Sequence, residues 1–136
     1  MLRIKHIRIK NFRSIVDLSI DVGKMNIFVG LNDAGKSNVL KALNLFFNGE
    51  TEPGVKYDFK TDYSQYAPVR KKKAKEITVS IVFAIPERYS YHDDVIWTRV
   101  WREGGLYKDN SSEWNFTPYS KVSTLLKRVK IIFYYW

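Results

Sequence analysis

The 136-residue sequence contains no cysteine. This absence excludes disulfide bonds, catalysis by a thiol and metal sites built from thiolates. The sequence also lacks an apolar run long enough for a membrane-spanning helix. Its first residues, MLRIKHIRIKNF, alternate charged and aliphatic side chains, whereas a signal peptide contains a continuous apolar block. We therefore expect a soluble protein of the cytoplasm.

Acidic residues are also scarce, with 14 Asp and Glu against 23 Lys and Arg, which gives a formal net charge of +9. A basic balance of this kind favours polyanionic partners such as nucleotides or nucleic acid. A soluble basic surface without such a partner is the alternative, and charge alone does not separate the two. The hydrophobic share of 45% is too high for a disordered chain and fits one ordinary domain with a core.

The first third of the chain predicts three strands and a helix. Residues 2–9 and 15–22 alternate apolar and polar side chains, which predicts an antiparallel pair at a sheet edge. Residues 25–30, MNIFVG, form the short apolar run of a strand buried on both faces. Apolar residues at helical spacing predict a helix over 37–47, and Gly49 lies where that helix should end.

The remainder of the chain gives weaker signals. Residues 49–75 are rich in Pro, Gly, Asp and Tyr without a period and end in the run RKKKAK, which predicts one mobile basic loop. Strand-like patterns follow at 76–85 and 95–101, and residues 118–129 could form a short helix. The chain ends in the apolar, strand-like stretch 130–136.

These patterns together predict an α/β fold. Residues 1–48 supply the strands, the glycine-bearing loop and the helix at the centre of a mixed sheet. Residues 49–75 form the basic loop, and residues 76–136 form an antiparallel β subdomain.

Residues 30–37, GLNDAGKS, satisfy the pattern G-x-x-x-x-G-K-[ST] of a phosphate-binding loop. Gly30 and Gly35 allow backbone conformations and a close approach that side chains would block. The loop amides and the positive end of the following helix can then face phosphate oxygens. Lys36 is placed to neutralise the β and γ phosphates, and the Ser37 hydroxyl can ligate Mg²⁺.

The place of this motif in the chain strengthens the prediction. Average residue usage gives a chance match in a chain of this length of about one in 200. The motif also lies between a predicted buried strand and a predicted amphipathic helix, which is the context that such a loop requires. The alternative is a glycine turn that caps an ordinary helix.

Three segments together resemble the ATP-binding-cassette (ABC) ATPases of the SMC and RecF type, in particular the overcoming-lysogenization-defect (OLD) family and its AAA-like relatives. The opening IKHIRIKNFRSI is similar to the family's first strand and its Asn-Phe-Arg/Lys-Ser turn. In NIFVGLNDAGKSN, Asn32 and Asn38 match the family's pattern G-x-N-x-x-G-K-[ST]-N. The helix VLKALNLFF follows directly. The resemblance is specific over residues 1–48 and vague beyond them.

The resemblance implies a nucleotide-binding site with ATP and Mg²⁺ as its cofactors. Arg13 and Ser14 would lie beside the nucleotide, near its base or phosphates, although Arg13 taken alone is typical of a solvated turn. Ser37 would be the protein ligand of Mg²⁺. The residues that would hold the phosphates and the metal are Gly30, Asn32, Asp33, Ala34, Gly35, Lys36, Ser37 and Asn38.

The sequence lacks the second half of the family's catalytic apparatus. In the family, that half carries an LSGGQ-like signature and a Walker B strand that ends in Asp-Glu. Here SIVFAIPE, residues 80–87, offers Glu87 without the preceding acid, and KIIFYYW ends without one. Phosphoryl transfer needs a metal-holding Asp and a water-orienting group. We therefore expect no catalytic residue in this chain and little or no turnover by it alone.

We accordingly expect the N-terminal part of a longer ATPase, either as a fragment or as a natural truncation. Relatives often continue into a Toprim nuclease domain. Those that act in phage defence or DNA repair couple ATP binding to dimerisation and DNA cleavage. The apolar end IIFYYW predicts self-association or cover by a missing C-terminal half of the ATPase.

A weaker signal is the basic run, which could follow a phosphate backbone while nearby Tyr or Trp rings stack on bases. A solvated basic loop is the simpler alternative. The residues concerned are Arg70, Lys71, Lys72, Lys73 and Lys75.

The leading hypothesis is the ATP-binding half of an ABC/OLD-type ATPase head that serves DNA processing in its full-length form. The alternative, from another class, is a non-enzymatic basic nucleic-acid-binding module with a vestigial loop. A complete small P-loop kinase or GTPase is disfavoured, because the sequence lacks a Walker B acid, a lid of arginines and a base-selecting N-K-x-D-like motif.

Overall fold

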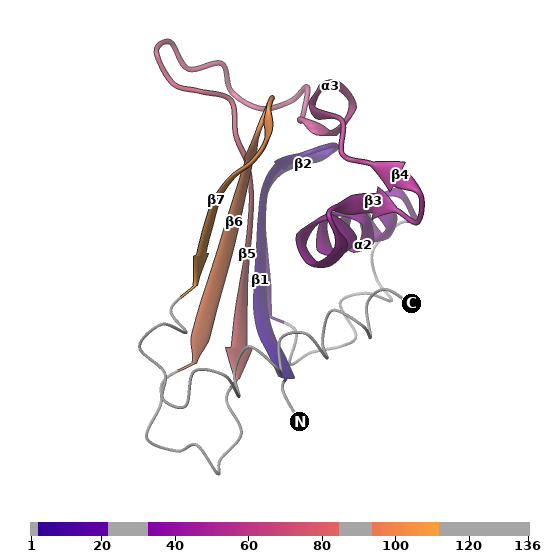
Figure 1. Cartoon of the computed structure of the whole chain (residues 1–136), viewed down its shortest axis with the longest axis vertical. Coiled ribbons are helices and arrows are strands. Elements are labelled where there is room, and N and C mark those ends of the chain that lie inside the picture. The colour runs from indigo at the N-terminus through magenta and orange to yellow at the C-terminus, as the bar shows by residue number, and fades with distance from the viewer. Residues whose placement is uncertain (1–2, 22–32, 85–93, 112–136) are drawn as a thin grey trace.

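The computed structural model describes residues 3–21, 33–84 and 94–111 (Figure 1). Its elements are, in chain order, β1 (Arg3–Phe12), β2 (Ile15–Asp21), α2 (Asp33–Asn48), β3 (Glu50–Glu52), β4 (Val55–Lys56), α3 (Phe59–Asp62), β5 (Ile77–Ala84), β6 (Val95–Arg102) and β7 (Gly105–Ser111). Helix α2 covers one face of the main sheet. Neither of the helices in the described residues is long and apolar enough to cross a membrane.

The main sheet has the strand order β2-β1-β5-β6-β7, and every described pairing in it is antiparallel. In β5, every second side chain from Ile77 to Phe83 is fully buried, and the residues between them are half-buried. Because successive side chains of a strand point to opposite faces, one face of the sheet is buried and the other is partly exposed. The antiparallel pair predicted at a sheet edge is confirmed, with β2 as the edge strand. The strands predicted over 76–85 and 95–101 are confirmed as β5 and β6.

Helix α2 packs its apolar stripe on this sheet. Val39, Leu43 and Phe46 are each at most 2% exposed and share one core cluster with Ile9 of β1 and Ile81 of β5. Burial of a side chain of this size contributes about 1.5–3 kcal/mol relative to its exposure. The contact between helix and sheet therefore contributes to the apolar core that holds the described residues together.

The helix extends beyond both ends of the range 37–47 predicted for it, from Asp33 to Asn48. Its end confirms the predicted role of Gly49, which has φ +74° and donates its N–H to the carbonyl of Leu45 at 2.9 Å. Glycine suits this left-handed position because it has no Cβ to clash with the preceding turn.

The prediction of a single loop over 49–75 is wrong for the first part of that segment. This part forms the β3–β4 hairpin, which turns at Gly54 with φ +80°, and the single helical turn α3. The Asp58 carboxylate caps α3 by accepting from the N–H of Lys60. Elements this short show no periodicity, because turn and capping contacts determine them. Residues 65–75 contain no helix or strand, are mostly exposed, and project beyond the end of the sheet (Figure 1).

The strands from residue 76 onward do not form a sheet of their own. They are antiparallel as predicted, but β5 pairs with β1, so both segments contribute to one sheet. All pairings among the described residues are antiparallel, and the mixed sheet stays a prediction. The predicted strand over 25–30, the predicted helix over 118–129 and the apolar end over 130–136 lie outside the described residues.

One arginine ties helix α2 to strands β6 and β7. The Arg99 guanidinium donates to the carbonyl of Phe46 at 2.6 Å and forms a forked pair with Asp109 at 3.1 and 3.2 Å. Trp97 packs its ring against that of Phe46, with centroids 4.9 Å apart. The last carbonyls of a helix have no partner within the helix, and α2 has no basic residue in its own last turn. Arg99 supplies the missing charge from the sheet.

We predict that Arg99→Met lowers the free energy of unfolding by about 1–3 kcal/mol, because a helix-terminal carbonyl and a carboxylate lose a charged partner. Urea denaturation followed by tryptophan fluorescence measures the change. Lys108→Met is the matched control: it removes the same charge from an exposed side chain on the neighbouring strand. It should cost less than about 0.5 kcal/mol. Equal losses in the two variants would contradict the role given to Arg99.

Candidate functional site

The turn between β1 and β2 contacts the helix that contains the second half of the loop motif. The side-chain amide of Asn38, in α2, donates a hydrogen bond of 2.6 Å to the hydroxyl oxygen of Ser14. These two residues are 24 positions apart in the sequence, and both are predicted site residues. Their contact joins the N-F-R-S turn to the first half of α2.

The backbone of this turn is held in an unfavourable conformation. Asn11 and Arg13 have φ of +60° and +51°, a region that costs a residue with a side chain about 1 kcal/mol or more. Two backbone hydrogen bonds compensate: the N–H of Arg13 donates to the carbonyl of Asp62 at 2.7 Å, and that of Ser64 donates to the carbonyl of Asn11 at 3.0 Å. The last residue of α3 and the segment that follows it thus fix the shape of the turn.

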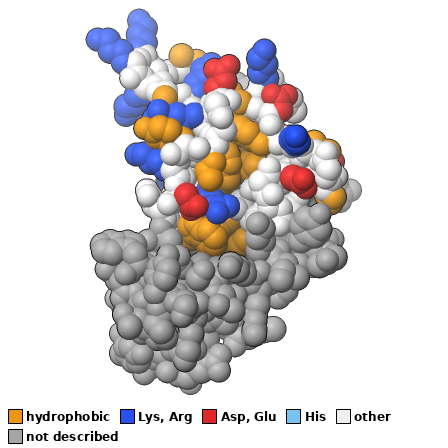
Figure 2. All heavy atoms as spheres, in the orientation of Figure 1, with side chains coloured by type: hydrophobic (Ala, Val, Ile, Leu, Met, Phe, Trp, Pro, Cys, Tyr) orange, Lys and Arg blue, Asp and Glu red, His pale blue; other side chains and the backbone are white. Residues whose placement is uncertain are grey.

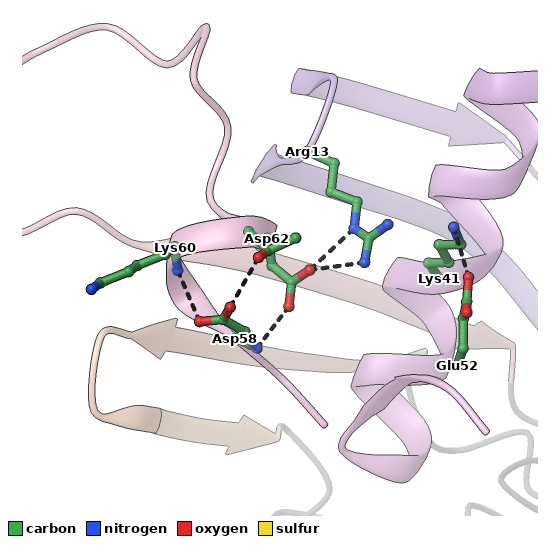
Figure 3. A network of polar contacts seen from close by, with 7 residues as sticks. Arg13, Lys41, Glu52, Asp58, Lys60 and Asp62 are labelled. Atoms are coloured by element: carbon green, nitrogen blue, oxygen red, sulfur yellow. Dashed lines mark hydrogen bonds and ion pairs between the residues drawn. The ribbon is translucent and has the colours of Figure 1, made fainter. Parts of the chain in front are cut away.

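Side chains strengthen the same contact (Figure 3). Nη2 and Nε of Arg13 lie 3.0 and 3.1 Å from one carboxylate oxygen of Asp62. The other oxygen accepts from the backbone N–H of Asp58 at 2.9 Å. The side chain of Asp62 is only 2% exposed and that of Arg13 is 22% exposed, so the pair is largely removed from water. Arg13 is therefore not a solvated turn residue, and its contact with a nucleotide stays a prediction.

A second ion pair links α2 to the β3–β4 hairpin (Figure 3). The Lys41 ammonium lies 2.8 Å from the Glu52 carboxylate. The hydrogen bond and the charge of Lys41 lower the pKa of Glu52 below its usual value. This pair is more exposed than the Arg13–Asp62 pair, so water screens more of its interaction.

The structure describes the loop motif itself only in part. Gly30 and Asn32 lie outside the described residues. For the motif residues Asp33 to Ser37, the backbone alone is described, and it forms the start of α2. The first N–H groups of a helix have no partner within the helix, and the positive end of its dipole lies there. Such a helix start suits the oxygens of a phosphate group, and the roles given to Lys36 and Ser37 stay predictions.

Asp62 is a residue of this region that sequence reasoning missed. The sequence D-F-K-T-D over 58–62 carries a capping signal at Asp58, but nothing in it indicates a partner 49 residues earlier. The residues of the basic run are all exposed and lie on the loop between α3 and β5, where blue side chains gather in Figure 2. Within the described residues, no group of three His, Asp or Glu side chains could hold a metal ion.

Comparison with known proteins gives a family match over nearly the whole chain. A family model described as the AAA ATPase domain matches residues 2–133. The OLD nuclease of Thermus scotoductus is 32% identical over 77 residues, which are 56% of this chain and 14% of that protein. Endonuclease GajA of Bacillus cereus is 34% identical over 71 residues, 52% of this chain and 12% of that protein.

A third relative comes from DNA repair. The DNA replication and repair protein RecF of Lactococcus lactis is 43% identical over 44 residues, 32% of this chain and 12% of that protein. These matches confirm the resemblance to SMC/RecF-like ATPases and to the OLD family. They imply the fold of a P-loop NTPase. The chain spans only 12–14% of the length of these three curated relatives.

We predict that Asp62→Ala lowers the free energy of unfolding by about 3 kcal/mol or more, because it leaves the Arg13 guanidinium and the N–H of Asp58 without their buried partner. Urea denaturation measures the loss. Glu52→Ala breaks the more exposed ion pair and should cost about 1 kcal/mol or less. The double variant Arg13→Met/Asp62→Ala should recover part of the loss, since no unpaired charge remains. Similar losses in both single variants would contradict a buried pair.

Proposed function

This chain belongs to the AAA ATPase domain family, and from that premise we propose that its loop over residues 30–37 binds ATP together with Mg²⁺. The observation that carries the proposal is the contact between Ser14 and Asn38, at 2.6 Å. It brings the two halves of the family pattern, the N-F-R-S turn and the end of G-L-N-D-A-G-K-S-N, to one place. A glycine turn that merely caps a helix would not need this contact.

Each residue has a role that follows from its chemistry. The backbone amides of Gly35 and its neighbours face the phosphates, and Lys36 neutralises the charge on the β and γ groups. The Ser37 hydroxyl ligates Mg²⁺. The hydrogen bond from the Asn38 amide to the Ser14 hydroxyl orients both side chains at the edge of the proposed site.

Arg13 acts beside the nucleotide without leaving Asp62. A guanidinium carries five N–H donors, and Asp62 occupies those of Nε and Nη2. The remaining donors are oriented by the fixed plane of the group, and the side chain stays 22% exposed. We therefore assign Arg13 to the base or phosphates of ATP as a pre-positioned donor.

Hydrolysis is the property of a larger assembly. The sequence contains no Walker B acid and no signature, so the 136 residues bind ATP with little or no turnover. The printed names of the relatives, OLD nuclease, endonuclease GajA and RecF, support a role of the whole protein in DNA processing, as a nuclease, in repair or in phage defence. Self-association, or cover by further residues of the ATPase, remains our proposal for the apolar end over 130–136.

We predict that Lys36→Ala abolishes binding of ATP-Mg²⁺ in isothermal titration calorimetry, because the phosphates lose their main counter-charge. Lys41→Ala is the matched control. It removes the same charge from the same helix, where Lys41 is engaged by Glu52, and it should leave the dissociation constant within about threefold.

Two results would count against the site. Wild type that binds no ATP would support the alternative, a basic nucleic-acid-binding module with a vestigial loop. Binding that survives Lys36→Ala unchanged would place the nucleotide elsewhere on the protein.

A further inference from the structure

An open groove of about 710 Å³ lies where the loop over residues 65–75 meets the end of the sheet. Lys10 of β1 and Thr78 of β5 contribute to one side of the groove, and the loop contributes Arg70, Lys73 and Lys75. Lys10 is opposite Thr78 in the strand register, on the face of the sheet that points away from α2. The groove is thus assembled from parts of the chain more than 50 residues apart.

The groove carries a net positive charge, because both of its carboxylates are paired with arginines. Its two carboxylates each have a partner: Glu76 pairs with Arg102 at 3.0 Å, and Asp17 pairs with Arg8 at 3.1 Å. The hydrogen bond from Arg8 holds the pKa of Asp17 below its usual value. The lining cations that form no ion pair among the described residues are Lys10, Arg70, Lys73 and Lys75.

The turn at the tip of the loop places its basic residues on two sides. The N–H of Lys73 approaches the carbonyl of Arg70 at 3.4 Å, and Lys72 has φ +66°, so residues 70–73 form a turn. Arg70 and Lys73, at the ends of this turn, line the groove, whereas Lys71 and Lys72 at its centre do not. The basic run therefore divides into an inner set that lines the groove, Arg70, Lys73 and Lys75, and an outer set that does not, Lys71 and Lys72.

Aromatic rings accompany the inner cations. Tyr63 lines the groove, stacks on Phe59 at 5.0 Å, and lies 5.8 Å from the Lys75 ammonium. Tyr66 lies between the lining residues Gln65 and Ala67 and is 64% exposed. Unpaired cations near aromatic rings suit a ligand that has both phosphates and flat bases. A free phosphate or an acidic peptide offers only the charge.

We propose that this groove binds the phosphodiester backbone of a nucleic acid strand. Lys10, Arg70, Lys73 and Lys75 contact phosphates, and Tyr66, which is exposed next to the groove without lining it, presents its ring to a base. The proposal rests on the proposed function only in taking nucleic acid as the substrate of the whole ATPase. None of the groove residues belongs to the loop over 30–37, so either site can fail in experiment without the other.

The test compares two double variants of the 136-residue chain that lose the same charge from the same loop. Lys73→Gln/Lys75→Gln changes the inner set, and Lys71→Gln/Lys72→Gln changes the outer set. Fluorescence anisotropy with a labelled oligonucleotide, single-stranded or duplex, gives affinity at several salt concentrations. Thermal melting by tryptophan fluorescence confirms that each variant is folded.

We expect the inner variant to bind the oligonucleotide about tenfold or more weakly near 0.1 M salt. The slope of the logarithm of its binding constant against the logarithm of salt concentration should be shallower by about 1.4–1.8, which corresponds to the loss of two phosphate contacts. The outer variant should stay within about twofold of wild type. Lys10→Gln, on the far wall, should weaken binding about threefold or more, although it lies outside the basic run. Tighter binding of the single strand supports the base contact assigned to Tyr66, and tighter binding of the duplex would contradict it.

Three outcomes would overturn the proposal. Equal losses in the inner and outer variants would mean that the loop acts as diffuse charge. Failure of wild type to bind either oligonucleotide at about 0.05 M salt would exclude the ligand. Equal affinity for polyglutamate would mean that the groove takes any polyanion. Lys36→Ala should leave oligonucleotide binding unchanged, and this separates the groove from the ATP site.

Discussion

The packing of helix α2 on strands β1 and β5 is the contact on which the rest of the structure depends. It buries Phe46 and Leu43 against Ile9 and Ile81, and it sets where the start of the helix lies relative to the sheet. Because a helix is rigid over this length, fixing its apolar face also fixes the position of its first turn. Arg99 then holds the other end of the helix through the carbonyl of Phe46.

The N-F-R-S turn is held by contacts with two parts of this scaffold. Ser14 contacts α2, while Arg13 is held by the last residue of α3 and Asn11 by the segment after it. Neither contact is available to a free hairpin, since two residues of the turn have unfavourable φ values that only tertiary hydrogen bonds offset. The segment between α2 and β5, which looks irregular in the sequence, therefore shapes the N-F-R-S turn of the proposed nucleotide site and lines the basic groove.

The sequence alone was sufficient to predict the elements with clear periodicity and to identify the family. The alternation in β1 and β2 and the helical spacing in α2 could be read directly, because burial on one face imposes them, and β5 and β6 were recognised as strand-like segments. The β3–β4 hairpin and α3 could not, since elements this short depend on local caps. The pairing of β5 with β1, and of Arg13 with Asp62, joins residues about 50 or more positions apart, and a single sequence gives no signal for such contacts.

The Arg13–Asp62 pair also limits how the site can respond to a ligand. Releasing Arg13 toward a nucleotide would leave a carboxylate that is 2% exposed without its counter-ion, a cost of several kcal/mol. A hydrogen bond from Arg13 to a phosphate would be partly exposed to water and would stabilise the complex by no more than that cost. Arg13 is thus expected to keep Asp62 as its partner when ATP binds. The turn then acts as a fixed support between the proposed nucleotide site and the groove, whose wall includes Asn11 of the turn and the adjacent Lys10.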